Sequence, residues 1–79
     1  MNPTATAPVI KVVELVGTSP DSWSDAARHA IDQAAQTIHG ITGVDVMRST
    51  ATVTDGKIDQ YRVDLKVAFV IDSNGNAGD

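Results

Sequence analysis

Hydrophobic and polar residues alternate through the last third of the chain, between Lys57 and Ile71. The apolar members all fall on one side of this alternation: Tyr61, Val63, Leu65, Val67, Phe69 and Ile71. The other side carries Gln60, Arg62, Asp64 and Lys66. A period of two residues over this length predicts a long β-strand with one buried face and one charged face.

A helical period lies nearer the start of the chain, behind Ser22. Apolar residues recur there at steps of three and four: Trp23, Ala26, Ala27, Ala30, Ile31, Ala34, Ala35 and Ile38. The stripe predicts an amphipathic helix that begins with a capping box of Ser22 and Asp25 and ends at His39-Gly40. Because five of these eight residues are alanine, we expect the helix to lie very close to the sheet that it covers.

Two more strands complete the predicted fold. Residues 9–17 are β-rich and apolar on both faces except at Lys11 and Glu14, which is typical of a strand between two layers or at a subunit contact. Residues 41–54 form a Thr- and Val-rich strand, and the Asp55-Gly56 pair after it predicts a type I′ hairpin. The order β-α-β-β predicts an α+β domain with a single helix, in which the last two strands are long and antiparallel.

The chain is small for a domain that folds alone. Residues 1–8 and 73–79 have no apolar period and are predicted to be flexible tails, which leaves one domain over residues 9–72. A domain of this size hides only about 60% of its surface on folding. We therefore expect the protein to gain stability by binding copies of itself.

Composition excludes several classes of function. The net charge is −4, and the six basic residues are spread along the chain, which argues against nucleic acid or an anionic membrane as a partner. The sequence has no cysteine and no apolar run of roughly 18 residues. It also lacks a secretory signal, a nucleophile motif and a phosphate-binding loop. These observations predict a cytoplasmic protein that is not an enzyme.

Four segments carry a resemblance to a known family: Val12-Val13-Glu14-Leu15-Val16-Gly17-Thr18-Ser19, Ser22-Trp23, Asp25-Ala26-Ala27 and Tyr61-Arg62-Val63. They resemble the corresponding parts of the dodecins, and the order of elements and the hairpin position agree over residues 10–71. The resemblance implies a three-stranded antiparallel sheet wrapped around one helix, and a non-enzymatic hollow sphere of twelve copies with cubic symmetry. It also implies paired binding of flavins, riboflavin or FMN, at two-fold contacts.

Two positions differ from the pattern of the flavin-binding dodecins. Gly43 stands where those members carry a tryptophan that stacks on the flavin, and Arg62 stands where they carry a glutamine. Loss of a stacking ring costs roughly 1–3 kcal/mol, by analogy with base stacking. The resemblance thus implies weakened flavin binding, at a site lined by Gly43, Val44, Asp45 and Arg62.

Alternative interpretations of these residues remain open at this point. Gly43 either opens a ligand pocket or permits a bulge or the close approach of another backbone. Arg62 either belongs with Asp64 and Lys66 to an ion-pair ladder across strands or subunits, or clamps a phosphate or carboxylate group. A flavin-free cage with a structural or calcium-binding role is the second functional hypothesis, because the Ser-Trp pair and the arginine are similar to a dodecin subgroup that lacks the stacking tryptophan.

A calcium-binding member is known in that subgroup, but the resemblance assigns no metal ligands. Asp25, His29 and Asp32 share one helix face at a spacing that could hold a cation, and a solvated polar face explains them equally. Trp23 is expected to pack in the core or at an interface.

Overall fold

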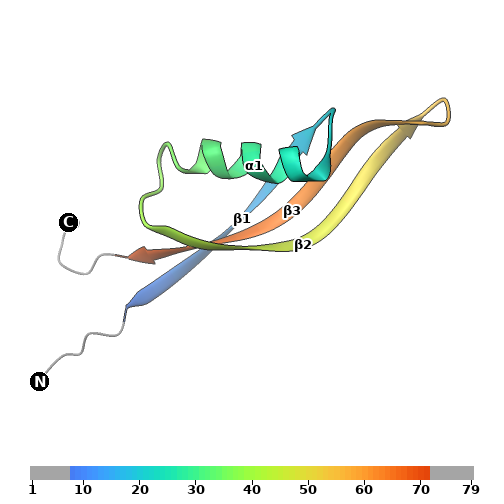
Figure 1. Ribbon diagram of the computed structural model, residues 1–79. Helices are drawn as coiled ribbons and strands as arrows, with labels where there is room; N and C mark the ends of the chain where they lie inside the picture. Colours follow the sequence, from blue (N-terminus) through green and yellow to red (C-terminus); the bar gives the residue numbers. More distant parts are fainter. Residues whose placement is uncertain (1–7, 72–79) are drawn as a thin grey trace, which may run out of the picture.

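The central strand of the sheet is β3 (Lys57–Ile71), which pairs antiparallel with β1 (Val9–Ser19) and with β2 (Ile41–Thr54). One helix, α1 (Trp23–Ala34), lies across one face of this sheet (Figure 1). The computed structural model describes residues 8–71, so the predicted tails lie outside it, Pro8 excepted. The predicted order β-α-β-β and the α+β class are confirmed.

The core sits between α1 and the middle of β3. Val63, Leu65 and Val67 point toward the helix and are fully buried, as the alternating pattern predicts, and α1 buries Ala26 and Ala30 against them. A helix of 12 residues is about 18 Å long, whereas a strand of 15 residues extends about 50 Å. The helix therefore covers only the middle of β3.

The helix and the sheet approach each other closely at Gly17 on β1. A methyl group at this position would overlap the carbonyl oxygen of Ala26 and lie 2.9 Å from the Cβ atom of Ala30. The small residues predicted to bring α1 close to the sheet thus meet a strand residue that has no side chain.

The β2–β3 hairpin has the predicted turn. Asp55 and Gly56 have φ angles of 53° and 75°, the positive values that a type I′ turn requires at both central positions. The hairpin extends past the start of α1, where no other helix or strand of the described residues accompanies it (Figure 1).

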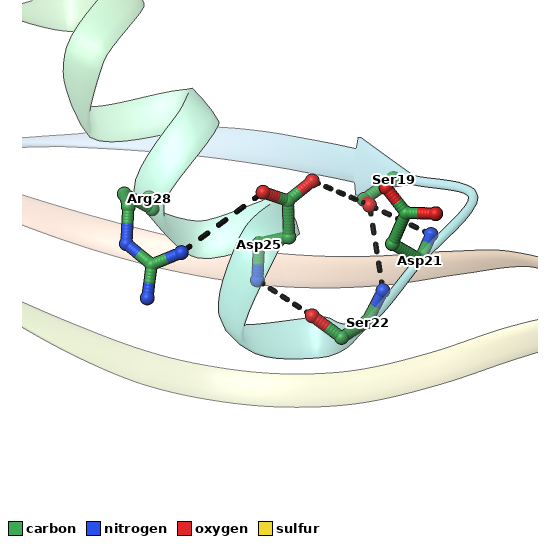
Figure 2. Close-up of polar contacts among 5 residues, drawn as sticks. All are labelled: Ser19, Asp21, Ser22, Asp25 and Arg28. Carbon is green, nitrogen blue, oxygen red and sulfur yellow. Dashed lines mark hydrogen bonds and ion pairs between the residues drawn. The ribbon is translucent and has the colours of Figure 1, made fainter.

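The start of α1 differs from the predicted capping box. The Oγ atom of Ser22 accepts a hydrogen bond from the backbone N–H of Asp25 at 3.0 Å, as predicted. The Asp25 carboxylate, however, does not return to Ser22 but accepts from the Ser19 hydroxyl at 2.7 Å. Ser19 Oγ in turn accepts from the backbone N–H groups of Asp21, at 2.9 Å, and Ser22, at 3.4 Å (Figure 2). Ser19 is thus the hydrogen-bonding centre of the β1–α1 turn.

We expect Ser19→Ala to lower the free energy of unfolding by about 1–2 kcal/mol, because Asp25 Oδ2 and two backbone donors lose the Ser19 hydroxyl as their partner in a part-buried turn. Urea denaturation followed by the fluorescence of Trp23, the single tryptophan, measures this loss. Ser24→Ala, at an exposed helix position, is the control and should leave stability nearly unchanged. Equal stabilities for the two variants would contradict the assigned role of Ser19.

The end of α1 is a second correction, because the helix ends at Ala34 and not at His39. Ala35 is its C-cap, and a tight turn follows in which the N–H of Ile38 donates to the carbonyl of Ala34 at 2.8 Å. Gly40 has the expected positive φ of 76°, but it leads into β2. The helix stops early because β2 must begin at Ile41, opposite Phe69 on β3.

Trp23, the first residue of α1, packs against the sheet at the edge of the core. Its ring meets Tyr61 of β3 edge to face, with the centroids 4.8 Å apart and the planes at 80°. Its Nε1–H donates to the backbone carbonyl of Thr50 on β2 at 2.7 Å. Trp23 therefore attaches the helix start to both strands of the hairpin while part of its ring stays exposed.

Candidate functional site

The face of the sheet opposite α1, called here the open face, is the candidate site. Strand register assigns side chains to it, because directly paired residues of antiparallel strands point to the same side. Its members are Ile10, Val12, Glu14, Val16 and Thr18 of β1, Arg62, Asp64, Lys66, Ala68 and Val70 of β3, and Gly43, Asp45, Arg48, Thr50 and Thr52 of β2. The one helix of the described residues packs on the other side, which leaves this face uncovered within one chain.

Charges of opposite sign oppose one another across the open face. Lys66 on the central strand is paired with Glu14 on one side and with Asp45 on the other. In the next row toward the hairpin, Asp64 is paired with Arg48. Opposite charges at directly paired positions stabilise a sheet by a few tenths of a kcal/mol to about 1 kcal/mol per pair.

Arg62 continues this charge pattern along β3. Its Nε atom lies 3.4 Å from Oδ1 of Asp64, and the two side chains are 54% and 34% exposed. Arg62 thus pairs with Asp64 of its own strand, whereas the predicted ladder runs across strands or subunits. A pair this exposed contributes at most about 1 kcal/mol, so it leaves Arg62 able to engage a ligand as well.

Two hollows adjoin on the open face and share Arg48, Arg62 and Asp64. The first, of about 320 Å³, is also lined by Thr50, Ala51 and Thr52. The second, of about 540 Å³, extends toward Glu14 and Lys66. The candidate site is therefore a shallow charged depression in the middle of the sheet.

The residues predicted from the sequence are spread along the open face, from Gly43 near one end to Arg62 in the charged depression. Gly43 is paired with Ala68 and Asp45 with Lys66, whereas Arg62 lies six residues before Ala68 on the same strand, a separation of about 20 Å. One copy of the chain does not bring Gly43 and Arg62 together. Val44 is paired with Val67, so its side chain points to the helix side.

Two irregularities in β2 decide which of its residues reach the open face. The pairing with β3 shifts between Ile41 and Gly43 and again between Val46 and Arg48. Gly43 thus lies at a bulge, as one of its two interpretations proposed. The same kind of bulge turns Arg48 onto the open face, a placement that strict alternation after Val44 and Val46 would not give.

One of the three candidate cation ligands on the helix, Asp25, already contacts other side chains. Asp25 accepts from Ser19 and lies 4.0 Å from Arg28. Within residues 8–71, no group of three or more His, Asp or Glu side chains is arranged to hold a metal ion. The described part of the chain also contains no helix long and apolar enough to cross a membrane.

Comparison with known proteins identifies the family of this chain. The sequence model of the dodecin family matches residues 9–72. The chain belongs to the dodecin family. A relative, the calcium dodecin of Mycobacterium tuberculosis, is 39% identical over 62 residues, which cover 77% of this chain and 86% of that protein.

Solved dodecin structures have the same fold. The dodecin from Streptomyces davaonensis superimposes with a TM-score of 0.81 at 33% identity, covering 85% of this chain and 98% of that one. The structure of the Mycobacterium tuberculosis calcium dodecin, described as calcium-chelating and as having a novel calcium-binding site, gives a TM-score of 0.71 at 36% identity and covers 82% of this chain and 93% of that one.

Family membership confirms the fold and the general class of function. Dodecins are homo-oligomeric cages that bind small ligands, and they are not known as enzymes. The prediction that so small a domain finishes its structure with copies of itself agrees with this class. Among the described residues, α1 packs only on the opposite side of the sheet and leaves the open face without a cover.

Proposed function

We propose that twelve copies of this chain form a hollow cage that binds a flavin, riboflavin or FMN, and holds it without chemical change. The observation that carries the proposal is the open face of a dodecin domain, which one chain leaves uncovered and on which Gly43, Asp45 and Arg62 all lie. Its apolar and charged positions provide both stacking surface and hydrogen-bond donors for an aromatic ligand.

Each flavin site takes residues from two copies in this proposal. Gly43 lies near one end of the open face and Arg62 about 20 Å from it by strand rise, with Asp45 between them along the strands. A two-fold contact is self-complementary. When Gly43 of one copy lies near Arg62 of its partner, Gly43 of the partner lies near Arg62 of the first copy, and two sites form together. Val44 supports the Gly43 end from the helix side of β2.

Native mass spectrometry of the freshly purified protein, followed by flavin titration, tests the proposal. A cage of twelve chains of 8.3 kDa has a mass of about 100 kDa, and bound flavin adds to it. Added riboflavin should lose its fluorescence when it stacks in the site. A monomeric protein, or no quenching of either riboflavin or FMN at micromolar concentration, would overturn the proposal.

Calcium is the second candidate ligand, favoured by the 39% identity to a calcium dodecin. In this alternative the ion takes ligands from more than one copy, since residues 8–71 of one chain hold no group of three acidic or histidine side chains for it. Calcium at 100 times its Kd should stabilise the protein by about 2.7 kcal/mol, and a chelator should reverse the rise in melting temperature. Magnesium is the control, and an unchanged melting temperature in calcium would reject this alternative.

A further inference from the structure

Arg48 and Arg62 are neighbours on the open face, although they are far apart in the sequence. Arg48 is paired with Asp64, and Arg62 lies two residues before Asp64 on the same strand, opposite Thr50. This places the two arginines at diagonal positions of adjacent strands, about 7–8 Å apart. Both line the same hollow of about 320 Å³, so their guanidinium groups can reach one ligand group between them.

The orientation of Arg62 leaves donors available to such a ligand. Its Nε–H is directed to Asp64 at 3.4 Å, which restrains the guanidinium plane while the terminal N–H groups remain outside this contact. Arginine donates through such groups in a planar fork that matches the oxygens of phosphate. Arg48, paired in register with the same carboxylate, supplies a second fork from the neighbouring strand.

Threonine residues of β2 complete the hollow. Thr50, opposite Arg62, and Thr52, nearer the hairpin, line it, and the Thr50 hydroxyl can donate to phosphate oxygens. Thr52 Oγ1 donates to the Asp59 carboxylate at 3.4 Å. The backbone of Thr50 is held from behind by the hydrogen bond from Trp23, so the strand under the hollow is fixed before a ligand arrives.

The charge of the hollow is opposite in sign to that of the protein. The chain carries −4 in total, whereas Arg48, Arg62 and Asp64 together leave one positive charge in the smaller hollow. A net negative protein repels anions in general. An anion that binds here must therefore be recognised through short-range contacts with the two arginines.

We propose that Arg48 and Arg62 form a cradle for a phosphate group, which makes the cage selective for phosphorylated ligands. This inference rests on the proposed function, because it specifies which flavin the cage takes: FMN, whose phosphomonoester would enter the cradle, in preference to riboflavin. The stacking of the ring system and the binding of the phosphate are separate contributions, so they can be measured separately.

Fluorescence titrations of the assembled protein with FMN and with riboflavin test the cradle. We expect the wild-type protein to bind FMN at least about tenfold more tightly than riboflavin, since a charge-assisted hydrogen bond contributes about this much. Arg48→Gln should reduce FMN affinity by about tenfold and leave riboflavin affinity unchanged. Arg28→Gln, which removes an arginine of the exposed helix surface, is the control and should change neither. Native mass spectrometry verifies that each variant assembles.

The possible results separate the cradle from the flavin proposal. Equal wild-type affinities for the two flavins, or equal losses of both in Arg48→Gln, would overturn the cradle and leave flavin binding intact. If neither flavin binds, the proposed function fails, and inorganic pyrophosphate then tests the cradle directly. These melting temperatures are compared with those in chloride of the same ionic strength. A rise with pyrophosphate in the wild type and in Arg28→Gln that is absent in Arg48→Gln supports the cradle. No rise in the wild type overturns it.

Discussion

Gly17→Ala is expected to lower the free energy of unfolding by about 3 kcal/mol and to prevent assembly. The added methyl group would overlap the carbonyl oxygen of Ala26 and approach Ala30 Cβ to 2.9 Å. Neither neighbour can rotate away, because one is helix backbone and the other is a Cβ atom. The helix must move off the sheet, and overpacking of this kind costs about 1–3 kcal/mol or more.

Gly43→Ala is the matched control for this substitution. A Cβ atom at Gly43 meets no heavy atom within 4 Å, so the same chemical change falls in open space on the other face of the sheet. Urea denaturation followed by Trp23 fluorescence compares the two variants, and native mass spectrometry compares their assembly. A Gly17→Ala protein as stable as Gly43→Ala would show that contact between α1 and β1 is looser than the structure describes.

The sequence predicted those parts of the fold that local chemistry determines. The Asp55-Gly56 turn follows from the positive φ angles that these residues tolerate. The burial of Leu65 follows from strict alternation along β3. The predicted end of the helix was wrong because Ala35 and Ile38 continue the apolar period beyond Ala34, the last helical residue. The position of β2, and not this period, determines where the chain must turn.

The candidate site was harder to predict because strand irregularities form it. A pattern of period two assigns each residue of β2 to a face only while pairing is regular. The bulge after Val46 reverses this assignment and turns Arg48 onto the open face. No sequence pattern assigns Arg48 to the open face. Arg62 lies on the regular strand β3, so its face of the sheet was predicted correctly.

Gly43→Trp is expected to strengthen flavin binding by roughly 5- to 150-fold. The resemblance to flavin-binding dodecins implies a stacking ring at this position, and one such ring contributes roughly 1–3 kcal/mol. The structure permits the substitution, because Gly43 has no positive φ angle and nothing lies within 4 Å of a Cβ atom built on it. The indole can therefore project from the open face without displacing the rest of its own chain.

Riboflavin, which lacks a phosphate group, is the appropriate probe for this variant, because its affinity depends on the stack and not on Arg48. Gly43→Leu is the control, since it adds apolar volume at the same position without an aromatic face. A gain in Gly43→Trp that Gly43→Leu does not share assigns the flavin to the Gly43 end of the open face. Equal gains would indicate apolar contact without stacking, and an unchanged affinity in both would place the flavin away from Gly43, nearer the hollow lined by Arg48 and Arg62.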